Sequence, residues 1–164
     1  MKRIAPQPLT AAAFAPFGEV IEVDAGAQPL VINRGQTLRF HDLAAIDVEA
    51  GGGRPALSVF RGEPLDPCVL AIFERHPLGS QAFVPLDGNP YLVAVAPAGA
   101  FDPAAVRIFR ATGRQGVNYR RNVWHHFLLP LTSGAHFLVI DREGPGVNLD
   151  EHELPLADRI AIDG

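Results

Sequence analysis

Short apolar runs separated by glycine and proline constrain the fold of this 164-residue chain more than any other feature. The chain has 16 glycines and 15 prolines, and they fall between the runs instead of gathering in one linker. The runs are rich in Val, Ile, Leu and Phe and are shorter than typical helices, which favours strands. The predicted strands are residues 19–23, 57–61, 69–75, 81–86, 91–96, 107–111, 123–129 and 135–141.

Turn and helix signals indicate how these strands are connected. The segment 87–90 reads Asp-Gly-Asn-Pro and the segment 132–134 reads Thr-Ser-Gly, and both are typical of tight turns. Helical signals are few: Thr10 can cap one short helix, Asp102 followed by Pro103 can open one turn, and residues 150–159 can add another. The pattern therefore predicts an all-β chain, folded as an antiparallel sandwich or barrel with a few short helices.

Composition limits the class of protein. With 48% hydrophobic and 20% charged residues, the chain resembles an ordinary globular protein, and we expect residues 1–164 to form a single domain. The net charge of −4 and the scattered basic residues argue against partners such as nucleic acid or an anionic membrane. Cys68 is the only cysteine, and the first ten residues lack the apolar stretch of a signal peptide. We therefore expect a cytoplasmic protein without disulfides.

Two segments hold many polar residues beside apolar runs, at 74–81 and 118–126. Glu74 and His76 are two residues apart, so on an extended strand their side chains point to the same face. Gln81 begins the next predicted strand, after a turn that contains Pro77 and Gly79. Three polar side chains are therefore predicted to converge inside one barrel.

This spacing matches the first motif of cupins, in which His-x-His is followed by Glu five residues later and by Gly seven residues after that. The corresponding residues here are Glu74, His76, Gln81 and Gly88, and His125 resembles the single histidine of the second cupin motif. Mixed nitrogen and oxygen ligands suit a divalent ion such as nickel, manganese or zinc. We therefore predict a cupin-like antiparallel β-barrel that could bind a metal through Glu74, His76, Gln81 and His125.

Other polar residues are candidates for the walls of the same site. His125 and His126 should point to opposite faces of a strand, so we expect only His125 to face the interior. Arg61 and Arg121 are alternative anchors for a carboxylate, because Arg binds carboxylates through two parallel hydrogen bonds. Trp124 has a ring and an N–H that suit a pocket wall, although it could equally fill the core.

Several blocks of the sequence resemble the ureidoglycolate lyase family. The two polar segments read ERHPLGSQAFVPL and GRQGVNYRRNVWHHFLLPL, and the blocks PLTAAAFAPFGEVIE, INRGQTLRFHDL and HFLVIDREGPGVNLDEHEL extend the resemblance from Pro8 to Leu154. The resemblance implies a cupin-like homodimer that cleaves (S)-ureidoglycolate to glyoxylate and urea during allantoin breakdown in purine metabolism. It also implies a divalent metal, namely nickel.

Roles for individual residues follow as hypotheses from that reaction. His76 is the candidate base for the substrate hydroxyl, and His125 or Tyr119 could protonate the departing urea nitrogen. Arg61 or Arg121 would hold the substrate carboxylate. The amides that could bond the ureido group are those of Asn33, Asn118 and Gln81.

Two other functions remain open from the sequence. A ureidoglycolate hydrolase would attack the urea carbonyl and release ammonia and carbon dioxide instead of urea. A cupin without catalytic activity could act as a sensor of a small carboxylic acid. Measuring urea against ammonia separates the two enzymes, and tight glyoxylate binding without turnover would indicate the sensor.

Overall fold

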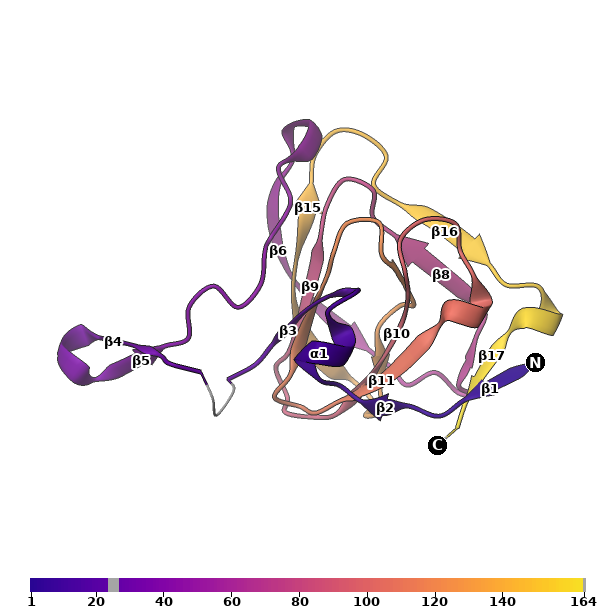
Figure 1. Ribbon diagram of the computed structural model, residues 1–164, viewed down its shortest axis with the longest axis horizontal. Coiled ribbons are helices and arrows are strands. Elements are labelled where there is room, and N and C mark those ends of the chain that lie inside the picture. The colour runs from indigo at the N-terminus through magenta and orange to yellow at the C-terminus, as the bar shows by residue number, and fades with distance from the viewer. Residues whose placement is uncertain (24–26, 164) are drawn as a thin grey trace.

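The computed structural model describes residues 1–23 and 27–163, and strands make up most of its regular structure (Figure 1). The all-β prediction is confirmed. Thr10 caps the short helix after it by accepting a hydrogen bond from the Ala13 amide at 3.2 Å, as predicted. The helical elements are α1 (Ala11–Phe14) and the 3-10 turns η1 (Asn33–Gly35), η2 (Ala50–Gly52), η3 (Pro103–Ala105) and η4 (Leu156–Asp158).

A seven-stranded sheet runs through the middle of the molecule. Its strands pair antiparallel except where the short strand β2 joins β11 in parallel. In spatial order the strands are β16 (Asp150–Glu153), β8 (Ile72–Arg75), β13 (Trp124–His125), β10 (Tyr91–Ala96), β11 (Arg107–Ala111) and β2 (Gln7–Pro8), with β14 (Leu129–Pro130) also paired to β10.

A five-stranded antiparallel sheet lies on one side of this sheet, and smaller sheets complete the molecule (Figure 1). Its order is β3 (Gly18–Ile21), β12 (Gly116–Tyr119), β9 (Gln81–Pro85), β15 (Ala135–Glu143) and β6 (Arg54–Gly62). A three-stranded sheet joins the two ends of the chain through β1 (Lys2–Ile4), β17 (Ile160–Ile162) and β7 (Val69–Leu70). The last sheet pairs β4 (Leu30–Ile32) with β5 (Thr37–Arg39).

Strand β10 shows how the layers are packed, because every one of its residues is buried. Val93 and Val95 belong to an apolar cluster shared with Phe83 and Phe137 of the five-stranded sheet. The alternate residues of β10 face a second cluster, which includes residues of β7 and β17. Each fully buried Val or Phe contributes about 1.5–3 kcal/mol through the hydrophobic effect. The two large sheets thus enclose a common core, which is the cupin-like barrel arrangement predicted from the sequence.

The turn between β8 and β9 carries the chain from one large sheet to the other. Ser80 fixes this turn by two hydrogen bonds with Asp47: its amide donates to the Asp47 carbonyl at 2.7 Å, and its hydroxyl accepts from the Asp47 amide at 2.9 Å. Asn148 holds the preceding part of the turn, because its side-chain oxygen accepts from the Leu78 amide at 2.7 Å. Residues before and after the turn therefore lie on facing walls.

Several details differ from the sequence prediction. The strand predicted over 123–129 is two short strands, β13 and β14, because the chain leaves the sheet between His125 and Leu129. The turn predicted over 150–159 begins as strand β16, and only η4 within it is helical. Strand β12 was not predicted, because its sequence Gly-Val-Asn-Tyr lacks a continuous apolar run.

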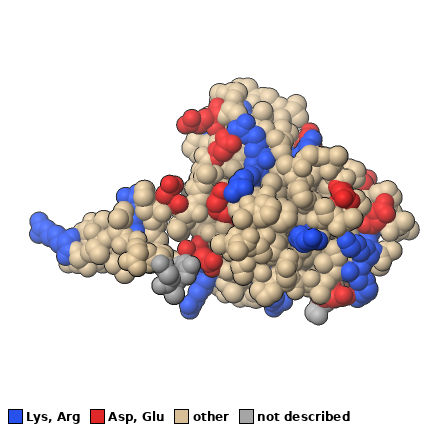
Figure 2. All heavy atoms as spheres, viewed as in Figure 1, with Lys and Arg blue, Asp and Glu red and all other residues tan. Residues whose placement is uncertain are grey.

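The hairpin of β4 and β5 projects from the body as an arm (Figure 1). We call residues 30–39 the arm. On the face in Figure 2, acidic and basic side chains are interspersed, in keeping with the scattered charge in the sequence. Among the described residues, no helix is long and apolar enough to cross a membrane.

Candidate active site and metal centre

Strand register places polar side chains of both large sheets in the space between them. His125 pairs with Val95 on one side and with Glu74 on the other, so all three side chains point to the same face. That face is the inner one, because Val95 belongs to the core shared by the two sheets. The five-stranded sheet forms the opposite wall, where Gln81 of β9 pairs with Tyr119 of β12, and both residues are buried.

Glu74, His76 and His125 form a compact cluster. One ligand atom from each lies within 4.8 Å of the other two. The Glu74 carboxylate is 3.8 Å from His76 Nε2 and 3.9 Å from His125 Nδ1. The ring of Tyr119 stacks on His125 at 4.3 Å with an interplanar angle of 4°, which fixes the plane of the histidine. The structure therefore brings together four of the residues singled out from the sequence.

The hydrogen bonds of His76 define which of its nitrogens faces Glu74 and Gln81. Its Nδ1 lies 2.8 Å from the backbone oxygen of Asn148, which can only accept, so Nδ1 carries a hydrogen. In the neutral ring the lone pair is then on Nε2, which lies 3.2 Å from the side-chain oxygen of Gln81. With Glu74 close by, three electron-pair donors converge on one point. A proton on Nε2 or a metal cation is required to satisfy them.

His125 supplies a second observation that fits a cation. Its Nδ1 lies 3.2 Å from the backbone oxygen of His126, and its Nε2 is buried without a hydrogen-bond partner among residues 1–23 and 27–163. Burial is the main cause that lowers the pKa of His125, to about 3, and the charge of His76 lowers it further. The ring is therefore neutral near pH 7, and neutral imidazole is the form that binds metals.

Burial and charge also shift the acids beside these histidines. The pKa of Glu74 is raised, chiefly by burial, although His76 lowers it and Glu151 raises it. The pKa of Tyr119 is raised well above its ordinary value by burial and then by the charge of Glu74. Tyr119 therefore keeps its hydroxyl hydrogen at any physiological pH, whereas Glu74 is easier to protonate than an exposed carboxyl group.

A cavity of about 460 Å³ opens onto this cluster. Arg61, on the edge strand β6, pairs with the outward residue His136, so it borders the cavity from the rim and is mostly exposed. Among the described lining residues it is the one with a permanent positive charge. His126 also borders the cavity, but its ring packs edge-on against Phe73 at 5.9 Å. Phe73 belongs to the second apolar cluster, so the two histidine rings lie in different surroundings, as alternation along a strand implies. The lining residues are Phe60, Arg61, Gly62, Glu74, Gln81, Phe83, His125, His126, Phe127 and Leu128.

Two residues predicted to bind substrate lie away from the cavity instead. Arg121 donates to Asp47 at 2.6 Å and lines a separate depression outside the cavity. Asn118 is fully buried, but its amide donates to Glu19 at 2.8 Å and to a backbone oxygen, because it sits on the face of β12 opposite to Tyr119. Both residues are occupied by structural contacts away from the cluster.

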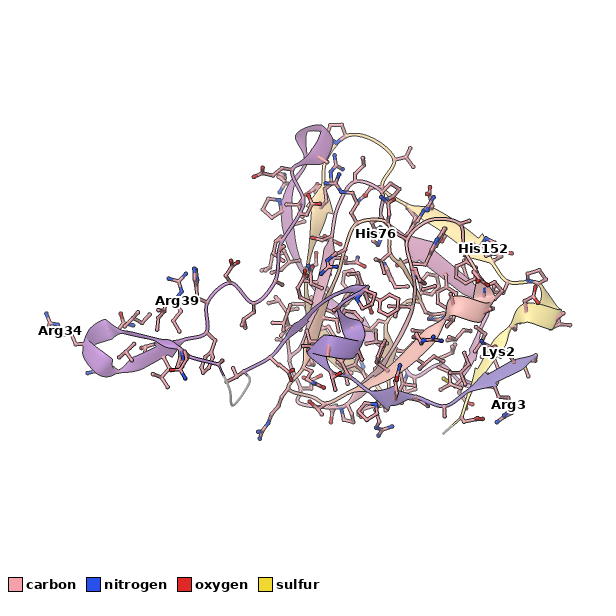
Figure 3. All side chains as sticks on the ribbon, in the orientation of Figure 1. Lys2, Arg3, Arg34, Arg39, His76 and His152 are labelled. Atoms are coloured by element: carbon pink, nitrogen blue, oxygen red, sulfur yellow. The ribbon has the colours of Figure 1, made fainter. Side chains whose placement is uncertain are left out.

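The other two predicted substrate ligands are also remote from the cavity. Trp124 alternates with His125 and belongs to the second apolar cluster, where its Nε1 donates to the Gly99 carbonyl at 3.0 Å. Asn33 lies on the arm and donates to Thr37 at 3.1 Å. Figure 3 shows the separation: the neighbouring Arg34 is at the tip of the arm, whereas His76 lies within the body.

Sequence reasoning did not identify two polar residues that hold the cluster in place. Asp141 accepts a hydrogen bond from the Gln81 amide at 3.2 Å, and Asn148 accepts from His76 through its backbone. Alternation along β15 could have revealed Asp141, because it follows the inward residues Phe137 and Val139 at intervals of two. No local pattern marks Asn148, since its contact depends on how a loop returns to β8.

Comparisons with known proteins indicate the family of this chain. The family model for ureidoglycolate lyase matches residues 1–161. Proteins named ureidoglycolate lyase are similar over most of the chain: one from Burkholderia mallei is 55% identical, with 94% of this chain and 91% of the relative covered. One from Pseudomonas entomophila is 50% identical, with coverage of 94% and 93%.

A relative from Pseudomonas syringae pv. tomato, also named ureidoglycolate lyase, is 48% identical and covers 99% of this chain and 96% of its own. Among solved structures, a dTDP sugar isomerase from Desulfovibrio desulfuricans G20 aligns with a TM-score of 0.40 and 14% identity, over 85% of this chain and 86% of its own. The family match and the sequence identities are decisive: the chain belongs to the ureidoglycolate lyase family.

Proposed function

We propose that the cavity cleaves ureidoglycolate into glyoxylate and urea. Membership of the ureidoglycolate lyase family supports the substrate and the lyase reaction. The observation that carries the proposal is the convergence of Glu74, His76 and His125, together with Gln81, beside a cavity that Glu74, Gln81 and His125 line. A cluster of this kind can move a proton or hold a cation, and the reaction needs one of these services.

The reaction defines what the residues must do. In ureidoglycolate one carbon bears a hydroxyl group, a carboxylate and a nitrogen of urea. The hydroxyl loses its proton, the oxygen–carbon bond becomes the double bond of the aldehyde, and the carbon–nitrogen bond breaks with its electron pair moving to nitrogen. That nitrogen must gain a proton, because the urea anion is a very poor leaving group. No atom is added, and the products are glyoxylate and urea.

Arg61 is the proposed anchor for the substrate carboxylate. It lines the cavity, its side chain is 68% exposed, and its nearest acidic partner, Glu63, is 4.0 Å away. Such a weak ion pair in solvent holds the guanidinium loosely. The guanidinium is therefore free to form two hydrogen bonds with an incoming carboxylate. Arg121 is a poorer candidate because Asp47 already occupies it outside the cavity.

Glu74 and His76 are the proposed proton carriers. His76 Nε2 faces Glu74 and Gln81, which line the cavity, and can take the hydroxyl proton, while the Glu74 carboxylate at 3.8 Å stabilises the resulting imidazolium. The same proton can then pass to the urea nitrogen. His125 and Tyr119 are less suited to donate it, because His125 stays neutral and the raised pKa of Tyr119 makes its hydroxyl a weak proton donor.

The same cluster fits a divalent metal ion. Glu74, His76 and His125 would hold it, with the amide oxygen of Gln81 as a fourth ligand. Nickel is the ion that family membership suggests, and mixed imidazole and carboxylate ligands suit it. When bound, such an ion supplies Lewis-acid polarisation of the substrate hydroxyl and lowers its pKa. A coordinated His76 cannot also accept a proton, so the two roles of His76 are mutually exclusive.

We propose that the protein is a homodimer in which each copy forms a single catalytic domain. The arm exposes Leu30, Val31 and Leu38, at 50%, 64% and 56%, and the edge strand β6 exposes Leu57 and Val59. A two-stranded hairpin is marginally stable by itself, so burial against a second copy would stabilise the arm. The cytoplasmic location stays a prediction.

An activity assay with product analysis tests the proposed reaction. We expect the purified protein to release urea and glyoxylate in equal amounts, whereas release of ammonia would indicate hydrolysis of the urea carbonyl and would contradict the lyase. Replacing His76 with Ala should lower turnover by at least about 100-fold, since it removes either a metal ligand or the proton carrier. His136→Ala is the matched control, because His136 is exposed and lies on the outer side of β15.

Chelation then separates the two roles of His76. Loss of activity that Ni²⁺ restores would assign His76 as a ligand. Full activity after chelation, with elemental analysis confirming that the protein is metal-free, would assign it as the proton carrier. Glyoxylate binding without any turnover would contradict the proposed function and indicate a sensor.

A further inference from the structure

The orientation of the Gln81 side chain is set from outside the metal cluster. Its amide nitrogen lies 3.2 Å from a carboxylate oxygen of Asp141, and its amide oxygen lies 3.2 Å from His76 Nε2. An ionised carboxylate only accepts hydrogen bonds, so the nitrogen end of the amide must face Asp141. The oxygen end is thereby directed to the point where His76 and Glu74 converge.

Strand pairing explains why Asp141 is next to Gln81. Strands β15 and β9 are neighbours, and their ladder pairs Val139 with Phe83 and Ile140 with Ala82. Continuing the register by one residue places Asp141 beside Gln81, on the inward face already occupied by Val139 and Phe83. Asp141 is therefore held in place by the backbone of the sheet and not by a flexible loop.

Stability alone does not explain an acid at this position. Among residues 1–23 and 27–163, Asp141 forms no ion pair, and its side-chain hydrogen bond goes to the neutral amide of Gln81. A partly buried carboxylate without a cationic partner costs free energy. A cation bound beside Gln81 would offset this cost, because the negative charge of Asp141 and the amide oxygen of Gln81 would both attract it.

We propose that Asp141 is a positioning residue, which holds the amide oxygen of Gln81 toward the cation-binding point formed with His76 and Glu74. The inference rests on the proposed function, because it assigns Asp141 a role in the same site. The two ends of a glutamine amide have nearly the same shape. If the residue at position 141 did not act purely as an acceptor, the Gln81 amide could turn around. Its N–H groups would then repel a bound cation, or would donate to His76 Nε2 and block the lone pair of that nitrogen.

Paired substitutions at positions 81 and 141 test this role. In Asp141→Asn the new amide can donate as well as accept, so it no longer fixes the direction of Gln81. In Gln81→Glu the new carboxylate faces Asp141, and two acceptors meet without a hydrogen. In the double variant, the amide introduced at position 141 can donate to the carboxylate introduced at position 81, which restores both a hydrogen bond and an oxygen directed at His76.

The measurements are the Ni²⁺ affinity of the chelator-stripped full-length chain, by calorimetry, and kcat/KM for ureidoglycolate. We expect Asp141→Asn to lower both by about 10–100-fold, the usual range for residues that orient metal ligands. When Gln81 is already replaced by Glu, adding Asp141→Asn should leave the Ni²⁺ affinity and kcat/KM unchanged or should increase them. Glu143→Gln is the matched control: it removes one charge from the same strand at an exposed position, and it should change neither quantity.

The outcome separates positioning from a purely structural contribution. A structural or long-range electrostatic role would make Asp141→Asn equally harmful in both backgrounds, and that result would overturn the proposal. Unchanged affinity and activity in Asp141→Asn would overturn it as well. A difference of about 10-fold or more between the two backgrounds would support it, because only residues in contact are expected to couple so strongly.

The two readouts also distinguish failure of this inference from failure of the proposed function. If the unmodified protein binds Ni²⁺ but does not cleave ureidoglycolate, the proposed function is wrong, and the affinities alone decide the role of Asp141. If it cleaves the substrate without binding Ni²⁺, the metal assignment is wrong and kcat/KM decides. If it does neither, both proposals fall.

Discussion

At the scale of single residues, the two candidate arginines make different predictions. Arg61 is loosely held at the cavity, whereas Arg121 is paired with Asp47 at 2.6 Å outside it. Hydrogen bonds to a charged partner contribute about 1.5–3 kcal/mol, which corresponds to about 10–100-fold in kcat/KM. We expect Arg61→Ala to cause a loss of that size, mainly through a higher KM, in steady-state assays with ureidoglycolate.

Two further variants make this prediction specific. Arg61→Lys should recover only part of the loss, because an ammonium group cannot form two parallel hydrogen bonds with a carboxylate. Arg121→Ala should leave KM within a few-fold of the unmodified protein. The opposite pattern, a raised KM in Arg121→Ala and an unchanged KM in Arg61→Ala, would show that the substrate carboxylate is held elsewhere.

Individual residues also show how far local sequence reasoning reaches. The two-residue spacing of Glu74 and His76 was enough to predict that their side chains meet, and they lie 3.8 Å apart although β8 ends at Arg75. The same alternation excludes Asn118 and Trp124 from the cavity, because their neighbours in the sequence, Tyr119 and His125, take the inward face. A polar segment shows which part of the sequence contributes to a site. Alternation along the strand and strand register then decide which of its residues face the cavity.

At the scale of elements, the arm leads to a prediction about assembly. Its apolar residues cannot be buried within one chain, because β4 and β5 contact chiefly each other and η1. We expect Val31→Asp and Leu38→Asp, made together, to convert a dimer to a monomer, since two buried charges would oppose association. Light scattering coupled to gel filtration measures the change directly.

A control variant tests whether the arm is responsible. Leu156→Asp places the same charge on η4, where the leucine is 74% exposed. This C-terminal part of the chain lies on the side of the body away from the arm (Figure 1). The substitution should not change the mass, and none of these surface variants should alter the circular dichroism spectrum. A monomeric unmodified protein, or a dimer that survives the double substitution, would contradict the proposed assembly.

Elements differ in how well the sequence predicted them, and the difference has a physical basis. Strands β9, β10, β11 and β15 are apolar runs bounded by turn residues, and they were predicted within a few residues. Strand β12 is polar because it supplies Asn118 and Tyr119 to two different environments, so hydrophobicity could not reveal it. The arm lies outside the core, and no pattern of burial within one chain could have predicted where it projects.

At the scale of the whole molecule, the buried histidines predict how stability depends on pH. Burial lowers the pKa of His125 from 6.5 to about 3 and also lowers the pKa of His126. In the unfolded chain these groups bind protons below about pH 6.5, but in the folded protein His125 remains neutral down to about pH 3. Protons therefore favour the unfolded state: these histidines carry no penalty above about pH 6.5, and the free energy of unfolding decreases as the pH falls below that value.

The expected size of the effect is measurable in the chelator-stripped protein. Each pH unit well below 6.5 costs about 1.4 kcal/mol for a fully buried histidine, so His125 alone should lower the free energy of unfolding by about 2 kcal/mol at pH 5. Glu74 acts in the opposite direction, because its raised pKa lets the folded state bind a proton more readily. The contribution of one histidine must therefore be obtained as a difference between variants.

Urea denaturation at pH 8 and at pH 5 provides that difference. The loss of stability between the two pH values should be smaller by about 2 kcal/mol in His125→Gln than in the unmodified protein. His126→Gln should also reduce the loss and serves as a second readout if the first variant folds poorly, whereas the exposed His136→Gln should leave it unchanged. An unchanged pH dependence in both buried variants would mean that these rings become protonated in the folded state. In that case the interior of the barrel would be far more hydrated than the packing of its two large sheets implies.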